Sequence, residues 1–180
     1  MANPLSERIT GFLPAFCPSA FERVLEFIGG TTRRERSVLR RYALFMIREA
    51  STSDNLGIRA LMQTVPGFWQ QWWSEMTITT AIKSARGLAF VWEENSLILG
   101  FVCAHDLGFR AYLSELVVST GVRNQGIATN LVRAVEEVLT GRGQRVLIAD
   151  VWHESETFYR ALGWEPPEVI LLRRRLKTRD

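Results

Sequence analysis

One stretch decides how this chain folds, and it reads Val118-Ser119-Thr120-Gly121-Val122-Arg123-Asn124-Gln125-Gly126-Ile127-Ala128-Thr129. A short apolar run precedes it, which is typical of a strand. The segment that follows it has helical periodicity, because one apolar stripe comprises Ile127, Leu131, Val135, Val138 and Leu139. Gly141 and Gly143 then end the pattern. The stretch is therefore predicted to be a turn that leads from a strand directly into a helix.

Such a turn has the chemistry of an anion site. The first turn of a helix has backbone N–H groups without acceptors, and the helix dipole adds partial positive charge there. Gly126 and Ala128 keep bulky side chains away from this backbone, and Arg123 adds a cation beside it. These features suit a pyrophosphate. The alternative is an ordinary loop that uses glycine only to turn.

The segments on either side predict a mixed α/β sheet. Strands are expected at 42–48, 88–93, 97–105, 110–118, 145–150 and 169–175, with Glu94-Asn95-Ser96 joining the second and third as a hairpin. Helices are expected at 54–64, 68–85, 126–140 and 154–162. The order is one strand, two helices, three strands, and then helix, strand, helix, strand.

Length and composition indicate one globular domain. The chain has 180 residues, 47% of them hydrophobic and 23% charged, which are ordinary values for a folded domain. We divide it into an N-terminal helical arm, 1–41, and a main domain, 42–180. Its longest apolar runs fall far below the ~20 residues of a membrane span, and no secretory signal is recognisable. Cys17 and Cys103 are expected to be reduced thiols in a cytoplasmic protein.

Four motifs resemble those of the GNAT superfamily of N-acetyltransferases. Arg123-Asn124-Gln125-Gly126-Ile127-Ala128 is similar to that family's Arg/Gln-x-x-Gly-x-Gly/Ala loop, and Leu116-Val117-Val118 to its Leu-x-Val strand. The segment from Phe158 to Trp164 resembles its Phe-Tyr-x-x-Leu-Gly-Phe sequence. Ile47 to Ala50, followed by Asp54, resembles its opening strand and first helix. The resemblance extends from Tyr42 to Leu176, and the order of the predicted elements is the family's order.

The resemblance implies a GNAT-like, mostly antiparallel twisted sheet flanked by helices, with an extra N-terminal helical segment. It also implies that acetyl-CoA binds as co-substrate. The predicted cofactor-binding residues are Leu116, Val117, Val118, Arg123, Asn124, Gln125, Gly126, Ile127, Ala128, Thr129, Trp152 and Ser155. The chain departs from the family at Thr120, where Pro is frequent, and at Trp152, where Asn is frequent. Trp152 therefore replaces the asparagine whose side chain usually contacts the cofactor in this family.

In this family a neutral amine attacks the thioester directly. An alkylamine with a pKa near ~10.4 is almost fully protonated at pH 7, so a base has to assist. Glu115 is the candidate base because it lies within an apolar strand, although it could instead only bind a nearby arginine or serine. Tyr159 is the candidate acid for the departing thiolate, and the alternative for it is a core aromatic residue.

Three tryptophans, Trp69, Trp72 and Trp73, fall within the region from which the family builds its acceptor pocket. They are candidates to line this pocket, or else to cover the sheet or a partner chain. His105 is a further candidate for the pocket, and we favour a turn over a proton relay for His105-Asp106. The two histidines, His105 and His153, provide no metal-ligand pattern, and no metal is expected.

Two alternative functions are weighed against that of an enzyme. The first is a non-catalytic GNAT-like acyl-CoA-binding protein that regulates or assembles, and the intact Tyr159 motif argues against it. The second is a nucleic-acid-binding module, suggested by five arginines within 33–41 and by Arg173-Arg174-Arg175. The net charge of +3 is modest, and we favour solvated surfaces for these arginines. A monomer and a homodimer are both compatible with the sequence, and the acceptor amine is left open.

Overall fold

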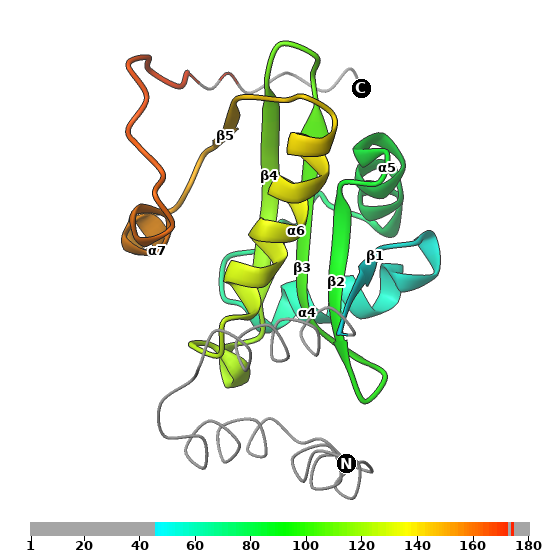
Figure 1. Cartoon of the computed structure of the whole chain (residues 1–180). Helices are drawn as coiled ribbons and strands as arrows, with labels where there is room; N and C mark the ends of the chain where they lie inside the picture. Colours follow the sequence, from blue (N-terminus) through cyan, green and yellow to red (C-terminus); the bar gives the residue numbers. More distant parts are fainter. Residues whose placement is uncertain (1–45, 173, 175–180) are drawn as a thin grey trace, which may run out of the picture. The chain divides into compact units, whose positions relative to one another are not determined.

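The central sheet is built by a meander that ends in one crossover. In the computed structural model, which describes residues 46–172 and 174, five strands lie in the order β1-β2-β3-β4-β5 (Figure 1). Their bounds are β1 Ile47–Glu49, β2 Ala89–Glu94, β3 Leu97–Asp106, β4 Ala111–Val118 and β5 Leu147–Ala149. The first three pairings are antiparallel and β4 pairs with β5 in parallel. This confirms the predicted mixed and mostly antiparallel sheet.

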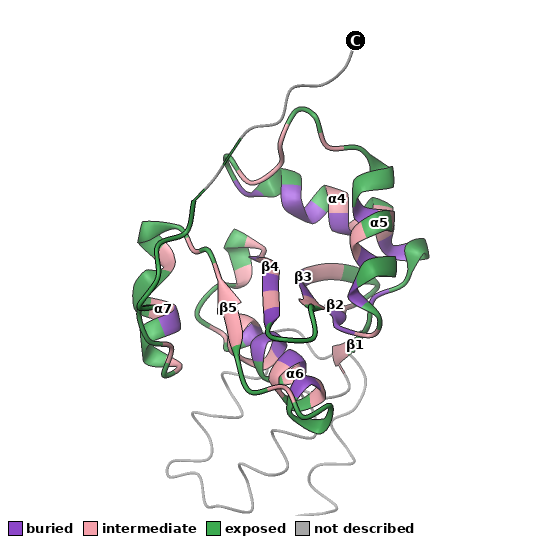
Figure 2. Cartoon of the chain, turned by 90° about the horizontal axis from the view of Figure 1, so that it is seen from above, coloured by how far each residue is buried: buried purple, intermediate pink, exposed green. Residues whose placement is uncertain are grey.

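Helices cover both faces of the sheet (Figure 2). Helices α4 (Asn55–Thr64) and α5 (Glu75–Ala85) lie on one face, and α6 (Ile127–Gly141) lies on the other. The short α7 (Glu156–Ala161) follows β5, and three 3₁₀ turns are η1 (Thr52–Asp54), η2 (Thr120–Val122) and η3 (His153–Ser155). Among the described helices none is long and apolar enough to cross a membrane.

The core lies between the sheet and these helices. Its largest fully buried side chains include Ile58 of α4, Phe101 of β3 and Leu131 of α6. Four residues of the apolar stripe predicted on α6, Ile127, Leu131, Val135 and Leu139, are buried, whereas Val138 is half-buried and Val132, outside the predicted stripe, is buried as well. The α6 helix approaches β3 closely at Gly100, where a Cβ atom would lie 2.8 Å from Ile127 Cγ2. The absence of a side chain at Gly100 therefore sets how near the start of α6 lies to the sheet.

Two predicted elements are corrected by the structure. The helix expected at 68–85 begins only at Glu75, because Ser74 precedes it with extended backbone and its N–H donates to Thr77 Oγ1 at 3.0 Å. The side-chain amide of Gln70 donates instead to the Gly67 carbonyl at 2.9 Å, as in a turn. The strand expected at 169–175 is absent from the part of it that is described, where Val169 to Leu172 are exposed.

Other predictions lie outside the described residues. These are the N-terminal arm at 1–41 with Cys17 and its arginines, residues 42–45 of the first strand, and Arg173 and Arg175. Cys103 is a free, buried thiol. The hairpin predicted at Glu94 to Ser96 is present, and its turn residues Asn95 and Ser96 have φ of 51° and 63°, which matches a two-residue primed turn.

Candidate active site

The predicted anion-binding turn is present at the start of α6. After β4 the chain makes the 3₁₀ turn η2, and Gly126 then caps α6 with φ of 79°. That left-handed conformation favours glycine. Asn130 is the first residue whose N–H reaches back to the Gly126 carbonyl, at 3.0 Å. The N–H groups of Ile127, Ala128 and Thr129 therefore have no acceptor within the helix and remain available for an anion.

The strand that leads into this turn has an open edge. β5 pairs with β4 only at Ala111, Tyr112 and Leu113, so the two strands separate beyond that point. The predicted cofactor-pairing residues Leu116 to Val118 lie on the separated part, and their other edge pairs with β3. Because a strand edge carries unpaired N–H and C=O groups, an extended ligand could pair with it there. Such a ligand would extend directly to the start of α6.

Glu115 lies beside an irregularity of β4. It is opposite Cys103, and the register between β3 and β4 shifts at the next position, so that one extra residue, Ser114, bulges. The side chain is half-buried. Burial, and to a smaller degree the negative charge of Asp150, raise the pKa of Glu115 to about 7. A carboxyl group with that pKa can accept and release protons near neutral pH.

Tyr159 is a neighbour of the same carboxylates. It is buried in α7 between Phe158 and Trp164, with both ring-centroid distances at 5.1 Å. Burial first, and then the charges of Asp150 and Glu115, raise its pKa to about 12. The hydroxyl therefore remains protonated at neutral pH. The two residues that the sequence singled out for catalysis are thus close enough for their charges to interact.

Asp150 and Tyr112 belong to this cluster and were missed by the sequence analysis. The Tyr112 hydroxyl donates a hydrogen bond to Asp150 Oδ1 across the β4–β5 pairing. The available signal was that Asp150 directly follows an apolar strand beside the predicted cofactor strand. A carboxylate at the end of a parallel strand is a frequent site residue. The charge of Asp150 contributes to the raised pKa of both Glu115 and Tyr159.

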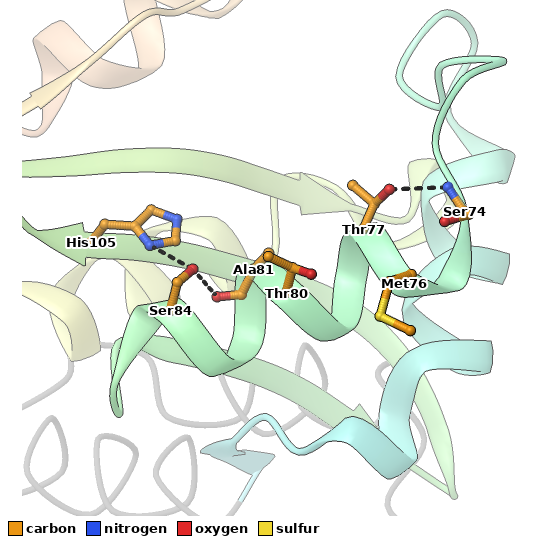
Figure 3. Close-up of a pocket in the computed structure, with 7 residues that line it drawn as sticks. All are labelled: Ser74, Met76, Thr77, Thr80, Ala81, Ser84 and His105. Carbon is orange, nitrogen blue, oxygen red and sulfur yellow. Dashed lines mark hydrogen bonds between the residues drawn. The ribbon is translucent and has the colours of Figure 1, made fainter. Parts of the chain in front are cut away.

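His105 of β3 lines a groove beside α5 (Figure 3). The groove has a volume of about 480 Å³ and is lined by Ser74, Met76, Thr77, Thr80, Ala81, Ser84 and His105. His105 Nε2 lies 3.1 Å from Ser114 Oγ, and Nδ1 lies 3.4 Å from Ser84 Oγ. Asp106 instead accepts from Gly108 N–H and the Gln144 amide, so the structure does not join His105 and Asp106 in a relay.

The tryptophans of the α4–α5 loop occupy different environments. Trp69 and Trp73 contact each other edge to face, with 5.7 Å between ring centroids. Trp72 is 74% exposed. Trp152 follows β5 and packs on Phe68, with 5.7 Å between centroids. Phe68 was missed as a site residue because its only sequence signal was its place beside the tryptophans.

Known proteins were compared with the sequence and the fold. Residues 56–164 match the sequence profile of the acetyltransferase (GNAT) family. No curated protein sequence matches the chain significantly. Among solved structures, a PaiA N-acetyltransferase from Thermoplasma acidophilum in complex with coenzyme A aligns with a TM-score of 0.60 and 16% identity, over 69% of this chain and 91% of that one.

Two further structures are similar to the fold. The ribosomal-protein-S18-alanine N-acetyltransferase from Escherichia coli aligns with a TM-score of 0.57 and 23% identity, over 65% of this chain and 75% of that one. An aminoglycoside N-acetyltransferase in complex with CoA aligns with a TM-score of 0.57 and 21% identity, over 72% and 93%. Such low identities establish only the fold, whereas the profile match covers more than half of the sequence. The chain belongs to the acetyltransferase (GNAT) family.

Proposed function

We propose that this chain transfers the acetyl group of acetyl-CoA to a primary amine within a ternary complex. The observation that carries the proposal is the succession of three parts around β4: its open edge, the start of α6 that follows it, and the carboxylate–phenol cluster of Glu115, Asp150 and Tyr159. The first two parts suit a long ligand with a pyrophosphate. The third suits an exchange of protons at its reactive end.

Acetyl-CoA would bind mainly through backbone groups. Its pantetheine arm pairs with the open edge at Leu116 to Val118, and its pyrophosphate accepts hydrogen bonds from the segment Gln125 to Thr129. Arg123, which is exposed beside this turn, adds electrostatic attraction. Ser155 in η3 remains a predicted contact of the cofactor. This placement directs the thioester toward Glu115, one residue before the pairing segment.

In the reaction that follows, Glu115 acts as the base and Tyr159 as the acid. Glu115 takes a proton from the ammonium of the acceptor, and the neutral nitrogen attacks the thioester carbonyl. The nitrogen of the tetrahedral intermediate loses its second proton to solvent, the intermediate collapses, the C–S bond breaks, and an amide forms. Tyr159 donates a hydrogen bond and then its proton to the departing sulfur, which leaves as the CoA thiol. Solvent returns the proton to the phenolate, and Glu115 releases its own.

Release of the CoA thiol tests the proposal. The full chain is incubated with acetyl-CoA and with each of a panel of primary amines, and free thiol and acetylated amine are measured together. We expect equal amounts of both products with at least one amine, and no thiol above background without amine. If acetyl-CoA binds saturably in calorimetry but no amine causes the release of CoA thiol, the proposed enzymatic activity is contradicted. This result would support the non-catalytic acyl-CoA-binding alternative instead.

A further inference from the structure

A chain of aromatic rings joins two segments that are far apart in the sequence. Trp69, Trp73 and Phe68 lie in the loop between α4 and α5, and Trp152 lies just after β5. Their successive ring centroids are 5.7 Å, 6.5 Å and 5.7 Å apart, from Trp69 through Trp73 and Phe68 to Trp152. We refer to these four residues as the aromatic bridge. Its contacts are tilted or edge to face, the arrangements that aromatic pairs favour.

One end of the bridge lies near the carboxylates. Trp152 follows Asp150 by two residues. The charge of Asp150 reaches both Glu115 and Tyr159, since it raises the pKa of each. A ligand held against Trp152 and Phe68 would therefore have its polar end within the field of these acidic groups.

The other end of the bridge carries a positive charge. The guanidinium of Arg59 lies 5.5 Å from the centre of the Trp69 ring. Arg59 also forms an ion pair with Glu75 at 3.1 Å, so its charge is partly neutralised. A second ammonium group on the acceptor would therefore gain no favourable charge interaction at this end. The bridge is thus negative near Asp150, apolar along its length, and weakly positive at Arg59.

The rings of the bridge are incompletely covered by the protein. Trp152 is 50% exposed, and Phe68, Trp69 and Trp73 are half-buried. Apolar surface left in water is unfavourable, by about 25 cal/mol per Å². Ring faces also attract ammonium groups through their quadrupole. A ligand that covers this surface and places an ammonium beside the carboxylates would satisfy both properties.

We propose that the aromatic bridge binds the acceptor and selects a primary monoamine carried on an aromatic or apolar body. This inference rests on the proposed function and names its substrate class. The apolar body packs on Phe68 and Trp152, and the amine points toward Glu115 and Asp150. Trp152 then acts mainly on the acceptor, and the asparagine frequent at its position in the family would not provide this surface.

The test compares two amines of similar basicity, 2-phenylethylamine and ethanolamine. We expect wild-type kcat/KM to be about tenfold higher for 2-phenylethylamine, a difference of about 1.4 kcal/mol, because its ring covers apolar surface that ethanolamine leaves in water. Trp152→Ala should remove most of this preference, through KM, and change kcat/KM for ethanolamine less than about twofold. Phe68→Leu, which keeps an apolar side chain, should show the same direction with a smaller loss.

A matched control removes an aromatic ring elsewhere. Phe109 in the β3–β4 turn is 96% exposed, and Phe109→Ala should leave both amines unaffected. Binding of acetyl-CoA is measured for every variant. If Trp152→Ala weakens acetyl-CoA and leaves the amine preference intact, Trp152 is a cofactor residue and the inference is wrong. Equal losses for both amines, or a wild-type preference for ethanolamine or for the dication putrescine, would also overturn it.

Binding without turnover separates the inference from the proposed function. Saturable quenching of tryptophan fluorescence by 2-phenylethylamine, in the presence of CoA, should occur in the wild type and disappear in Trp152→Ala. If no amine is acetylated yet this quenching is seen, the proposed function fails and the aromatic bridge still binds amines. If amines are acetylated but no quenching or preference is seen, only the inference fails.

Discussion

Glu115 determines how the proposed reaction depends on pH. Its pKa is raised from 4.5 to about 7, so the carboxylate that accepts a proton forms only as the pH rises through that value. We expect kcat/KM to increase about tenfold per pH unit well below 7 and to bend near 7. Glu115→Gln should lower the rate about 100-fold and remove this bend. A bend near 7 that persists in Glu115→Gln would show that another group is the base.

The Tyr159 hydroxyl is expected to act in the chemical step and not in the binding of acetyl-CoA. Its pKa of about 12 keeps the hydroxyl protonated throughout the neutral range, so the acid is available at every pH at which Glu115 is ionised. Tyr159→Phe keeps the ring between Phe158 and Trp164 and removes only the hydroxyl. We expect kcat to fall about 100-fold, with the Kd of acetyl-CoA changed less than twofold. An unchanged kcat would assign Tyr159 to the core alone.

The sequence could predict individual candidate residues of the site, but not the side chains with which they interact. Glu115 stood out because a carboxylate interrupts an apolar strand, and Tyr159 because of its motif. Asp150 and Tyr112 are 38 residues apart, and their hydrogen bond depends on the parallel pairing of β4 with β5. The contact of Phe68 with Trp152 likewise joins two separate loops. No local periodicity encodes such contacts, so they become visible only in the fold.

At the scale of elements, the proposed cofactor site depends most on the position of α6. A Cβ at Gly100 would lie 2.8 Å from Ile127 Cγ2 and 2.9 Å from Leu131 Cδ1, so Gly100→Ala forces these side chains to shift, and we expect the first turns of α6 to move with them. We expect the free energy of unfolding to fall by about 1–3 kcal/mol and the Kd of acetyl-CoA to rise. Urea unfolding and calorimetry measure the two effects.

Gly141, the last residue of α6, provides the control for that substitution. A Cβ there meets nothing within 4 Å. Gly141→Ala should therefore leave the affinity for acetyl-CoA unchanged. It should not lower the free energy of unfolding, because alanine has a higher helix propensity than glycine. If Gly100→Ala were as stable and as tightly binding as Gly141→Ala, the close approach of α6 to β3 would not matter for the site.

The same scale shows why some element boundaries escaped prediction. α6 was predictable because its stripe is long and regular and glycines end it. The stretch 68–74 places large residues at helical spacing, with Trp69 three and four residues before Trp72 and Trp73, so its pattern favours a helix. The helix nevertheless begins only at Glu75, where its start depends on the local contact between Ser74 and Thr77. The run from Val169 to Leu172 has strand composition, yet a strand also needs a pairing partner, which composition cannot supply.

For the whole molecule, the connections restrict the sheet to few arrangements. The hairpin at Asn95-Ser96 and the short turn after Asp106 place β2, β3 and β4 side by side and antiparallel. The crossover through α6 is long enough to return β5 in parallel. This order could be predicted from the sequence. The early separation of β5 from β4, on which the proposed site depends, could not, because it reflects how few residues of β5 pair.

The ion pair at the first corner of the domain governs stability toward acid. Asp54, 8% exposed, accepts from Arg48 Nη1 and Nη2 at 2.8 and 2.7 Å, and Arg48 with Ser51 lowers its pKa from 3.8 to about 2. The ionised form is favoured by folding, so its contribution is present above pH ~4 and is lost as the pH falls toward 2. Asp54→Asn should therefore lower the free energy of unfolding by about 2 kcal/mol at pH 7, and by less at pH 3, in urea titrations.

The exposed ion pair between Glu75 and Arg59 provides the control, because Glu75→Gln should lower the free energy of unfolding by under ~0.5 kcal/mol. An equal cost for Asp54→Asn at both pH values would mean that packing, and not the charge of Asp54, holds β1 to α4.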